Sequence, residues 1–330
     1  MKKIYALLLA AALWSCAKNE SPFPAAQAPV RDALLTVRIA GAETTKSTAT
    51  NWEDAKVSSA TVYVFNSDGT LDNSATSTTN TVTVRCSQGV GKKVRVVVGK
   101  SISSAIGSVS DLGAANTALT ENTAGHFVMT GGENNVEIQA TATAPIEIEV
   151  VRYASKVSLA KITNSLTETT WKDLEFRVKG IYLINAPGGA FPLFADSYTP
   201  SLWYNQMGHE AGAADNWLYD SMNTVIANGA SLSQSHTFYC MPNPTAADAN
   251  GGSFTPRKTR LVVEVQIGTR TFYYPITLGT LERNKHYSIA NLNLTRLGSS
   301  HPDYPVSSAQ AQFDIQVKDW TTVNMNTQTI

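Results

Sequence analysis

The chain has 330 residues, a formal net charge of zero and only 16% charged side chains. This length suits about two domains, and a hydrophobic content of 43% excludes a disordered chain. The neutral balance removes any electrostatic case for nucleic acid or an anionic membrane as the main partner. Threonine is abundant, with 37 residues. Because threonine is β-branched and favours exposed strand faces, the composition predicts a β-rich secreted protein.

Residues 1–16 are typical of a bacterial lipoprotein signal peptide. Two lysines precede an apolar run over residues 4–13, which is too short to span a bilayer because a transmembrane helix needs about 20 residues. The run ends in Leu13-Trp14-Ser15-Cys16, which resembles a lipobox. The alternative is an ordinary signal peptide, but a cysteine at this spacing favours a lipoprotein. We therefore expect Cys16 to be lipidated.

A tether and a first strand follow in residues 17–46. The Pro- and Ala-rich residues 17–32 are typical of a flexible linker. Leu35, Val37 and Ile39 then alternate with polar side chains, and this period of two predicts a strand over residues 34–39. The same signals predict one helix inside residues 101–120 and further strands over residues 60–65, 81–84, 94–98 and 136–140.

A second run of short strands begins near residue 145. Gly180 is expected to mark a bulge or a bend in one of them. Spacing and turn signals favour two Greek-key β-sandwich domains over alternating βαβ units. We therefore predict an all-β protein with domains over residues 47–145 and 146–330. The strands expected in the second domain cover residues 146–151, 156–159, 174–178, 181–184, 236–241, 260–267, 270–276 and 287–295.

The C-terminal residues form a second strongly alternating segment. Phe313, Ile315 and Val317 alternate with polar residues and are expected to anchor one strand, after which Asp319-Trp320 breaks the phase. Alternation then resumes and continues to Ile330. A strand with a free end can pair within its own sheet or add to the sheet of another molecule. The apolar or Thr positions of this last segment are Val323, Met325, Thr327 and Thr329.

No motif in the chain predicts catalysis, a metal site or a cofactor. The five histidines lack the spacing of a zinc site or of a zinc-protease helix, and we expect no enzyme. Cys86 and Cys240 lie in expected strands. We interpret them as single buried thiols, with a disulfide between them as the lesser alternative.

One group of aromatic residues leaves a different function open. Trp203, Tyr204, Trp217 and Tyr219 lie in a long loop region, where such rings stack on sugars or pack beneath the loop. Packing is the more ordinary role of large aromatic side chains. The alternative function is therefore a monomeric surface lipoprotein that binds glycans through these rings.

Several segments, in this order and at this spacing, resemble the fimbrillin family of the Bacteroidales, the subunits of donor-strand (type V) fimbriae. They run over most of the chain. The segments are the lipobox at Cys16; Thr61-Val62-Tyr63-Val64-Phe65 with Asp68-Gly69; Val151-Arg152-Tyr153-Ala154-Ser155-Lys156-Val157; Phe238-Tyr239-Cys240-Met241-Pro242-Asn243; Arg283-Asn284-Lys285-His286-Tyr287; and Val317-Lys318-Asp319-Trp320.

The resemblance implies two tandem transthyretin-like β-sandwich domains in a subunit of a cell-surface fimbria that supports adhesion. Precursors of the family travel as lipoproteins to the outer membrane, where a trypsin-like protease cuts after a basic residue beyond the first strand. The matching residue here is Lys46, followed by Ser47, with Arg38 and Arg31 as fallback sites. The alternative within the family is a fimbrial tip or anchor subunit.

The resemblance also implies how such subunits assemble. The first strand, with Leu35, Val37 and Ile39, leaves after cleavage, and the C-terminal strand of a copy or of a related subunit fills the groove. The residues expected to fill the pockets are Val323, Met325, Thr327 and Thr329. Because donor and groove lie at different places on a subunit, such contacts propagate head to tail.

Overall fold

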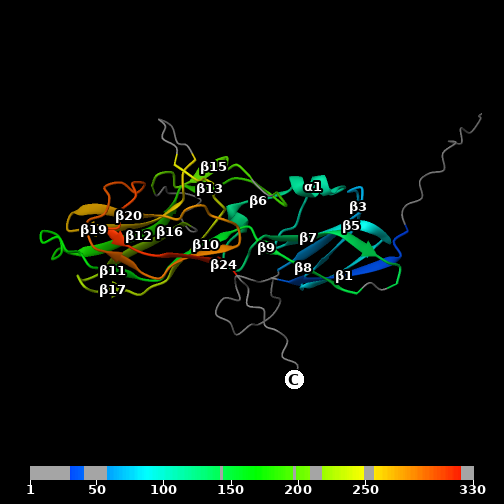
Figure 1. The fold of residues 1–330 in the computed structure, drawn as a ribbon, viewed down its shortest axis with the longest axis horizontal. Helices are drawn as coiled ribbons and strands as arrows, with labels where there is room; N and C mark the ends of the chain where they lie inside the picture. The colour runs from blue at the N-terminus through cyan, green and yellow to red at the C-terminus, as the bar shows by residue number, and fades with distance from the viewer. Residues whose placement is uncertain are drawn as a thin grey trace, which may run out of the picture. The chain divides into compact units, whose positions relative to one another are not determined.

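The computed structural model describes residues 30–40, 58–141, 144–195, 198–208, 218–248 and 256–320 (Figure 1). Nearly all regular elements in these ranges are strands, accompanied by one short α-helix and one 3-10 helix. Within the same ranges, no helix has the length and apolar character needed to cross a membrane. The all-β fold expected from alternation and composition is therefore confirmed.

The elements before residue 153 form an N-terminal sandwich of two sheets. They are β1 (Ala33–Ala40), β2 (Ala60–Phe65), β3 (Leu71–Ser77), β4 (Thr81–Cys86), β5 (Gly89–Val98), α1 (Val109–Ala114), β6 (Asn116–Thr117), η2 (Leu119–Glu121), β7 (Met129–Ile138), β8 (Ile146–Glu149) and β9 (Val151–Arg152). One sheet has the order β4-β1-β8 and the other the order β3-β2-β5-β7-β9.

The elements from residue 155 onward form the C-terminal sheets. They are β10 (Ser155–Leu159), β11 (Ile162–Asn164), β12 (Phe176–Ile184), β13 (Ala186–Gly188), β14 (Phe191–Pro192), β15 (Leu202–Tyr204), β16 (Tyr219–Val225), β17 (Ser231–Leu232), β18 (His236–Cys240), β19 (Arg260–Ile267), β20 (Arg270–Thr277), β21 (Lys285–Ile289), β22 (Leu292–Leu294), β23 (Ala311–Gln312) and β24 (Ile315–Asp319). Three sheets have four strands each, in the orders β18-β10-β21-β24, β17-β11-β22-β23 and β16-β12-β19-β20. Two short pairs, β13-β15 and β14-β6, complete the pattern.

Strand pairing places the boundary between the N-terminal and C-terminal sheets later than the predicted boundary at residue 145. β8 pairs in parallel with β1, and β9 pairs with β7, so both belong to the N-terminal sheets. β10, which begins at Ser155, pairs with β18 and β21, and both of these strands belong to the C-terminal sheets. The alternation from Ile146 marks a strand correctly, but alternation identifies a buried face and not the neighbouring strand.

The interior of the N-terminal sandwich is one cluster of buried side chains from both sheets. Val62 of β2 and Val96 of β5 pack there with the inward side chains of β1. The other face of the five-stranded sheet, which includes Phe65, is buried in a second cluster together with Leu112 of α1 and the C-terminal core. The helix expected inside residues 101–120 is thus only six residues long, and its single buried side chain is Leu112.

Two further expectations from the sequence are confirmed. Gly180 lies where the register of β12 shifts against both of its neighbours. A Cβ at this position would lie 2.8 Å from the ring of Tyr219, so a larger residue there would force that ring to move. Cys86 and Cys240 are free and buried, and burial raises the pKa of the Cys240 thiol to about 12. Neither cysteine is in the electropositive, exposed setting of a reactive thiol.

Candidate functional site

The first strand, β1, is the middle strand of its sheet. It pairs antiparallel with β4 along residues 33–38 and parallel with β8 along residues 37–40. Removing β1 would leave β4 and β8 with facing rows of unpaired backbone N–H and C=O groups. Such groups are costly to leave without partners, so the vacated place would be a groove shaped for another strand.

One face of β1 fills the interior of the N-terminal sandwich. Leu35 and Val37 are completely buried and Ile39 is 3% exposed, so the three alternating apolar residues of the predicted strand face the core. Full burial of three such side chains contributes about 5–9 kcal/mol in total. On the opposite face, Leu34 is 52% exposed and Arg38 lies at the surface. The strand is therefore held by its backbone ladder and by one row of pockets.

The basic residues predicted as cleavage sites lie at different places around β1. Arg38 is inside the strand, with Thr81 of β4 on one side and Glu147 of β8 on the other. Proteolysis concentrates at exposed loops with unpaired backbone, which makes Arg38 a poor site. Arg31 precedes β1, and a cut there would leave the whole strand attached. Lys46 and Ser47, between β1 and β2, lie outside the described residues.

A buried carboxylate lies beside the start of β1. Asp72 of β3 is 1% exposed, and the register between β2 and β3 shifts at this residue. Its Oδ2 accepts hydrogen bonds from Lys92 Nζ at 2.7 Å and from the Ser87 main-chain N–H and Oγ, each at 2.8 Å. Arg31 Nε lies 3.5 Å from the second oxygen, Oδ1. We call these four residues the Asp72 site.

The charge state of Asp72 follows from these neighbours. Burial alone raises the pKa of Asp72, but the hydrogen bonds from Lys92 and Ser87 outweigh it and hold the pKa below its ordinary value of 3.8. The carboxylate is therefore ionised at neutral pH. No sequence pattern predicts this site, because an acidic residue soon after an Asp-Gly turn is typical of a solvated loop.

The C-terminal strand of the described residues, β24, lies at the edge of its sheet. It pairs with β21 on one side only. Ile315 packs against the hydrophobic core, whereas Phe313 is 38% and Val317 is 53% exposed. The expectation that all three side chains anchor this strand is therefore wrong for Phe313 and Val317. The predicted donor residues, Val323, Met325, Thr327 and Thr329, lie outside the described residues.

The residue that anchors this end of the chain is Trp320, which is 5% exposed. Its ring stacks on Tyr239 at a centroid distance of 5.5 Å and meets the edge of Phe127 at 5.0 Å. The Arg152 guanidinium lies over the Trp320 ring at 4.6 Å and donates from Nη1 to the Trp320 carbonyl oxygen at 3.0 Å. The Trp320 main-chain N–H donates to the Asn284 main-chain carbonyl oxygen at 2.8 Å. We call this group the Trp320 cluster.

The Trp320 cluster joins the two sandwiches. Phe127 and Trp320 belong to the N-terminal hydrophobic cluster, and Tyr239 of β18 packs against it from the C-terminal sheets. Arg152, Tyr239, Asn284 and Trp320 come from four of the segments on which the family resemblance rests. The sequence showed each segment separately, but their meeting at one point depends on the tertiary fold.

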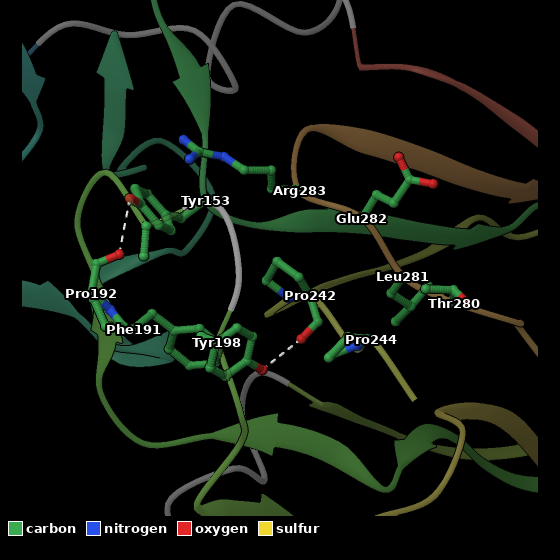
Figure 2. Close-up of a pocket in the computed structure, with 11 residues that line it drawn as sticks. Tyr153, Phe191, Pro192, Tyr198, Pro242, Pro244, Thr280, Leu281, Glu282 and Arg283 are labelled. Atoms are coloured by element: carbon green, nitrogen blue, oxygen red, sulfur yellow. Dashed lines mark hydrogen bonds between the residues drawn. The ribbon is translucent and has the colours of Figure 1, made fainter. Parts of the chain in front are cut away.

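An apolar pocket of about 310 Å³ lies among the residues drawn in Figure 2. The Tyr153 hydroxyl donates to the Pro192 carbonyl oxygen at 3.2 Å, and the Tyr198 hydroxyl donates to the Pro242 carbonyl oxygen at 2.7 Å. The Arg283 guanidinium lies over the Tyr153 ring at 4.0 Å. These polar groups stabilise the walls of the pocket, and they do not form a constellation for acid–base or nucleophilic chemistry.

Other candidate sites in the described residues are structural. No group of three or more His, Cys, Asp or Glu side chains within these ranges is placed to hold a metal ion. Trp203 is 7% exposed, and Tyr204 and Tyr219 are partly buried and pack against hydrophobic clusters. This burial favours packing over sugar stacking for the three rings. Trp217 lies outside the described residues.

Comparison with known proteins gives matches at two levels. The sequence profile of the family described as major fimbrial subunit protein (FimA) matches residues 33–169. This range includes the whole N-terminal sandwich and three residues of the Asp72 site, whereas Arg31 lies just before it. No curated protein matches the chain by sequence. The chain also matches solved structures, and the three described below are 15–20% identical to it.

Three of those structures share the fold over most of their length. A candidate cell adhesion protein from Bacteroides eggerthii has a TM-score of 0.67 at 20% identity, covering 88% of this chain and 97% of that chain. A fimbrilin (FimA) from Porphyromonas gingivalis has a TM-score of 0.64 at 18% identity, covering 90% and 99%. The tip fimbrial protein Mfa3 from the same organism, with a C-terminal truncation, has a TM-score of 0.55 at 15% identity, covering 87% and 98%.

The profile match and the strand architecture agree with the motifs that the sequence displays. The matched family is one of structural fimbrial subunits and not of enzymes, and it acts in fimbriae at the cell surface. The expected resemblance is therefore confirmed: over residues 33–169 the chain is similar to the FimA family of major fimbrial subunit proteins, and it shares its fold with a fimbrilin.

Proposed function

We propose that the chain is a polymerising fimbrial subunit that is activated by the loss of β1. It is exported as a lipoprotein through Cys16, a trypsin-like protease cuts between Lys46 and Ser47, and β1 leaves. The C-terminal strand of a neighbouring copy or related subunit then enters the groove between β4 and β8. The observation that carries the proposal is the position of β1 as a middle strand with one buried row of side chains.

The chain connectivity around β1 suits this mechanism. Nineteen residues of sequence, 41–59, separate β1 from β2, and Lys46 and Lys56 are the two basic residues among them. One cut in this stretch breaks the only covalent link from β1 to the rest of the sandwich. Non-covalent forces alone then hold β1, which can exchange with a strand that offers equal pairing and side chains for the same pockets.

The proposed donor is the alternating segment over residues 323–329. Val323, Met325, Thr327 and Thr329 repeat with the spacing of Ala33, Leu35, Val37 and Ile39, so both sets can place four side chains on one face of a strand. Trp320 supports this assignment, because its cluster fixes the chain just before the donor segment. A donor with a fixed root loses less conformational freedom on binding than a free tail does.

Electron microscopy of the purified precursor before and after limited proteolysis tests the proposal. We expect monomers before cleavage and filaments after it. A variant lacking residues 323–330 should stay folded and monomeric after the same cleavage. Filaments that persist in the deletion variant would contradict the donor assignment, and filaments from uncleaved precursor would contradict the role of β1.

The lipid anchor is tested separately. The variant Cys16→Ser should release the precursor from the membrane fraction, with the mass of an attached lipid absent from the protein. A precursor that carries no lipid at Cys16 in the parent chain would contradict the lipoprotein route, and it would leave the strand-exchange mechanism standing.

A further inference from the structure

The Asp72 site contains one oxygen atom that its own sandwich does not satisfy. Asp72 Oδ2 accepts three hydrogen bonds, from Lys92 and Ser87. Asp72 Oδ1 is buried and accepts none, and the cation next to it is the guanidinium of Arg31, 3.5 Å away. A buried anionic oxygen without a donor is costly, and a nearby cation offsets part of that cost.

Arg31 is also tied to its surroundings at two further points. Its guanidinium donates to the Asp72 main-chain carbonyl oxygen, and its own carbonyl oxygen accepts from Arg85 Nε at 3.0 Å. Arg85 belongs to β4, one of the two walls of the groove, and Asp72 belongs to the facing sheet. Arg31 therefore links the start of β1 to both sheets of the N-terminal sandwich.

We propose that Asp72 is a specificity-determining residue of the groove. In this role it selects entering strands that carry a Lys or Arg just outside the first pocket, in the place of Arg31. The inference rests on the proposed function, because Arg31 leaves the site only if β1 leaves. Once Arg31 has gone, water can reach Asp72 Oδ1. An entering strand without a cation displaces that water and leaves Asp72 Oδ1 without a partner. The site therefore disfavours strands that lack a cation and favours strands that carry one.

The proposal identifies the kind of partner that fits best. Residues 321–330 of this chain contain no Lys or Arg, so a copy of the chain brings no cation on its donor segment. The preferred partner is a related subunit whose donor strand is flanked by a basic residue. Asp72 would then favour contacts between unlike subunits over contacts between copies.

A peptide-binding experiment on the full chain tests the proposal. A site for a sequence-specific protease is placed within residues 41–57, the chain is cut, and fluorescent peptides of residues 30–40 are titrated in. We expect Arg31→Gln in the peptide to weaken binding about tenfold, as for a charge pair with one buried partner. The matched peptide control is Arg38→Gln, which removes an exposed charge on the same strand and should change binding less than about twofold.

The variant Asp72→Asn in the protein completes a double-mutant cycle with the peptide variant Arg31→Gln. On this protein the Arg31→Gln peptide should bind within about twofold of the parent peptide. An equal tenfold loss on both proteins would overturn the proposal, because Arg31 would then act without Asp72. If the cut chain neither releases β1 nor takes up the parent peptide, the proposed function fails first, and this inference fails with it.

A second measurement keeps the test decisive if Asp72→Asn does not fold. Peptides of residues 321–330 are compared on the parent protein with a basic residue added at one flank or the other. Thr321→Arg should tighten binding about tenfold if the donor runs in the direction of β1, and an Arg added after Ile330 should do so if it runs the opposite way. Thr322→Arg, one residue out of phase, is the control. If an added arginine raises the affinity at neither flank, the proposal is overturned.

Discussion

β1 and β10 occupy the same topological place in the two halves of the molecule. Each is a middle strand with one antiparallel and one parallel neighbour: β1 lies between β4 and β8, and β10 lies between β18 and β21. They differ in their connections. Nineteen residues follow β1 before the next strand, whereas Ala160 and Lys161 alone separate β10 from β11.

The two strands also differ in burial. Every second side chain of β1 faces the surface or is only partly covered, whereas four of the five residues of β10 are buried, including Ser155 and Lys156. A strand buried on both faces and joined tightly at both ends cannot leave without opening the core. For a middle strand to be removable, it therefore needs a long link to the next strand and a single buried face.

The largest expected effect comes from cutting the chain after each strand. A protease site placed within residues 41–57 should give, after cleavage, a protein that still unfolds cooperatively and exchanges β1 for excess competing peptide. The same site placed between Ala160 and Lys161 should abolish cooperative unfolding of the C-terminal sheets, because the cut divides their shared core. Calorimetry of cut and uncut proteins measures both outcomes. If both cut proteins unfold cooperatively, or if neither does, β1 and β10 do not differ in the way described above.

Loss of Trp320 should be the most damaging single substitution. Trp320→Ala removes a buried indole that packs against Phe127 and Tyr239, at an expected cost of about 3–5 kcal/mol in the free energy of unfolding. Tyr304→Ala, at a side chain that is 61% exposed, serves as the control and should change it by less than about 0.5 kcal/mol. Denaturant unfolding provides the measurement, and similar losses for both variants would contradict the anchoring role of Trp320.

Substitutions of two matched leucines test whether β1 leaves the subunit on assembly while β10 stays. Leu35→Ala in β1 and Leu159→Ala in β10 each empty a fully buried site, and each should destabilise the uncleaved precursor by about 2–5 kcal/mol. In assembled filaments, only Leu159→Ala should still lower the denaturant midpoint, because we propose that β1 has left the subunit there. A filament that Leu35→Ala destabilises as much as Leu159→Ala does would show that β1 has stayed.

The smallest expected effect is on the pH dependence of the melting temperature. Because the pKa of Asp72 is lower in the folded protein than its ordinary 3.8, its stabilisation is complete above that value and is lost as the pH falls through the folded pKa. Asp72→Asn should therefore lower the melting temperature at pH 7 by about 2–4 °C per kcal/mol lost, with the gap closing below pH 3.8. A gap that stays constant down to pH 2 would contradict an ionised Asp72.

Local patterns predicted the strands, and tertiary pairing supplied what those patterns lacked. Alternation at Leu35, Val37 and Ile39 was enough to predict β1 and its buried face. Its parallel partner β8 lies more than 100 residues further along the chain, and no local pattern identifies a partner at that distance, so the domain boundary was placed too early. The phase break at Trp320 was visible, but the convergence of Arg152, Tyr239 and Phe127 on its ring depends on the fold.

The intact mass of subunits extracted from assembled fibres shows whether β1 has left them. The account predicts a polypeptide that starts at Ser47, with residues 33–40 absent from the fibre. Subunits that retain residues 33–40, whether covalently attached or as a bound fragment, would contradict the claim that the loss of β1 opens the groove for the next subunit.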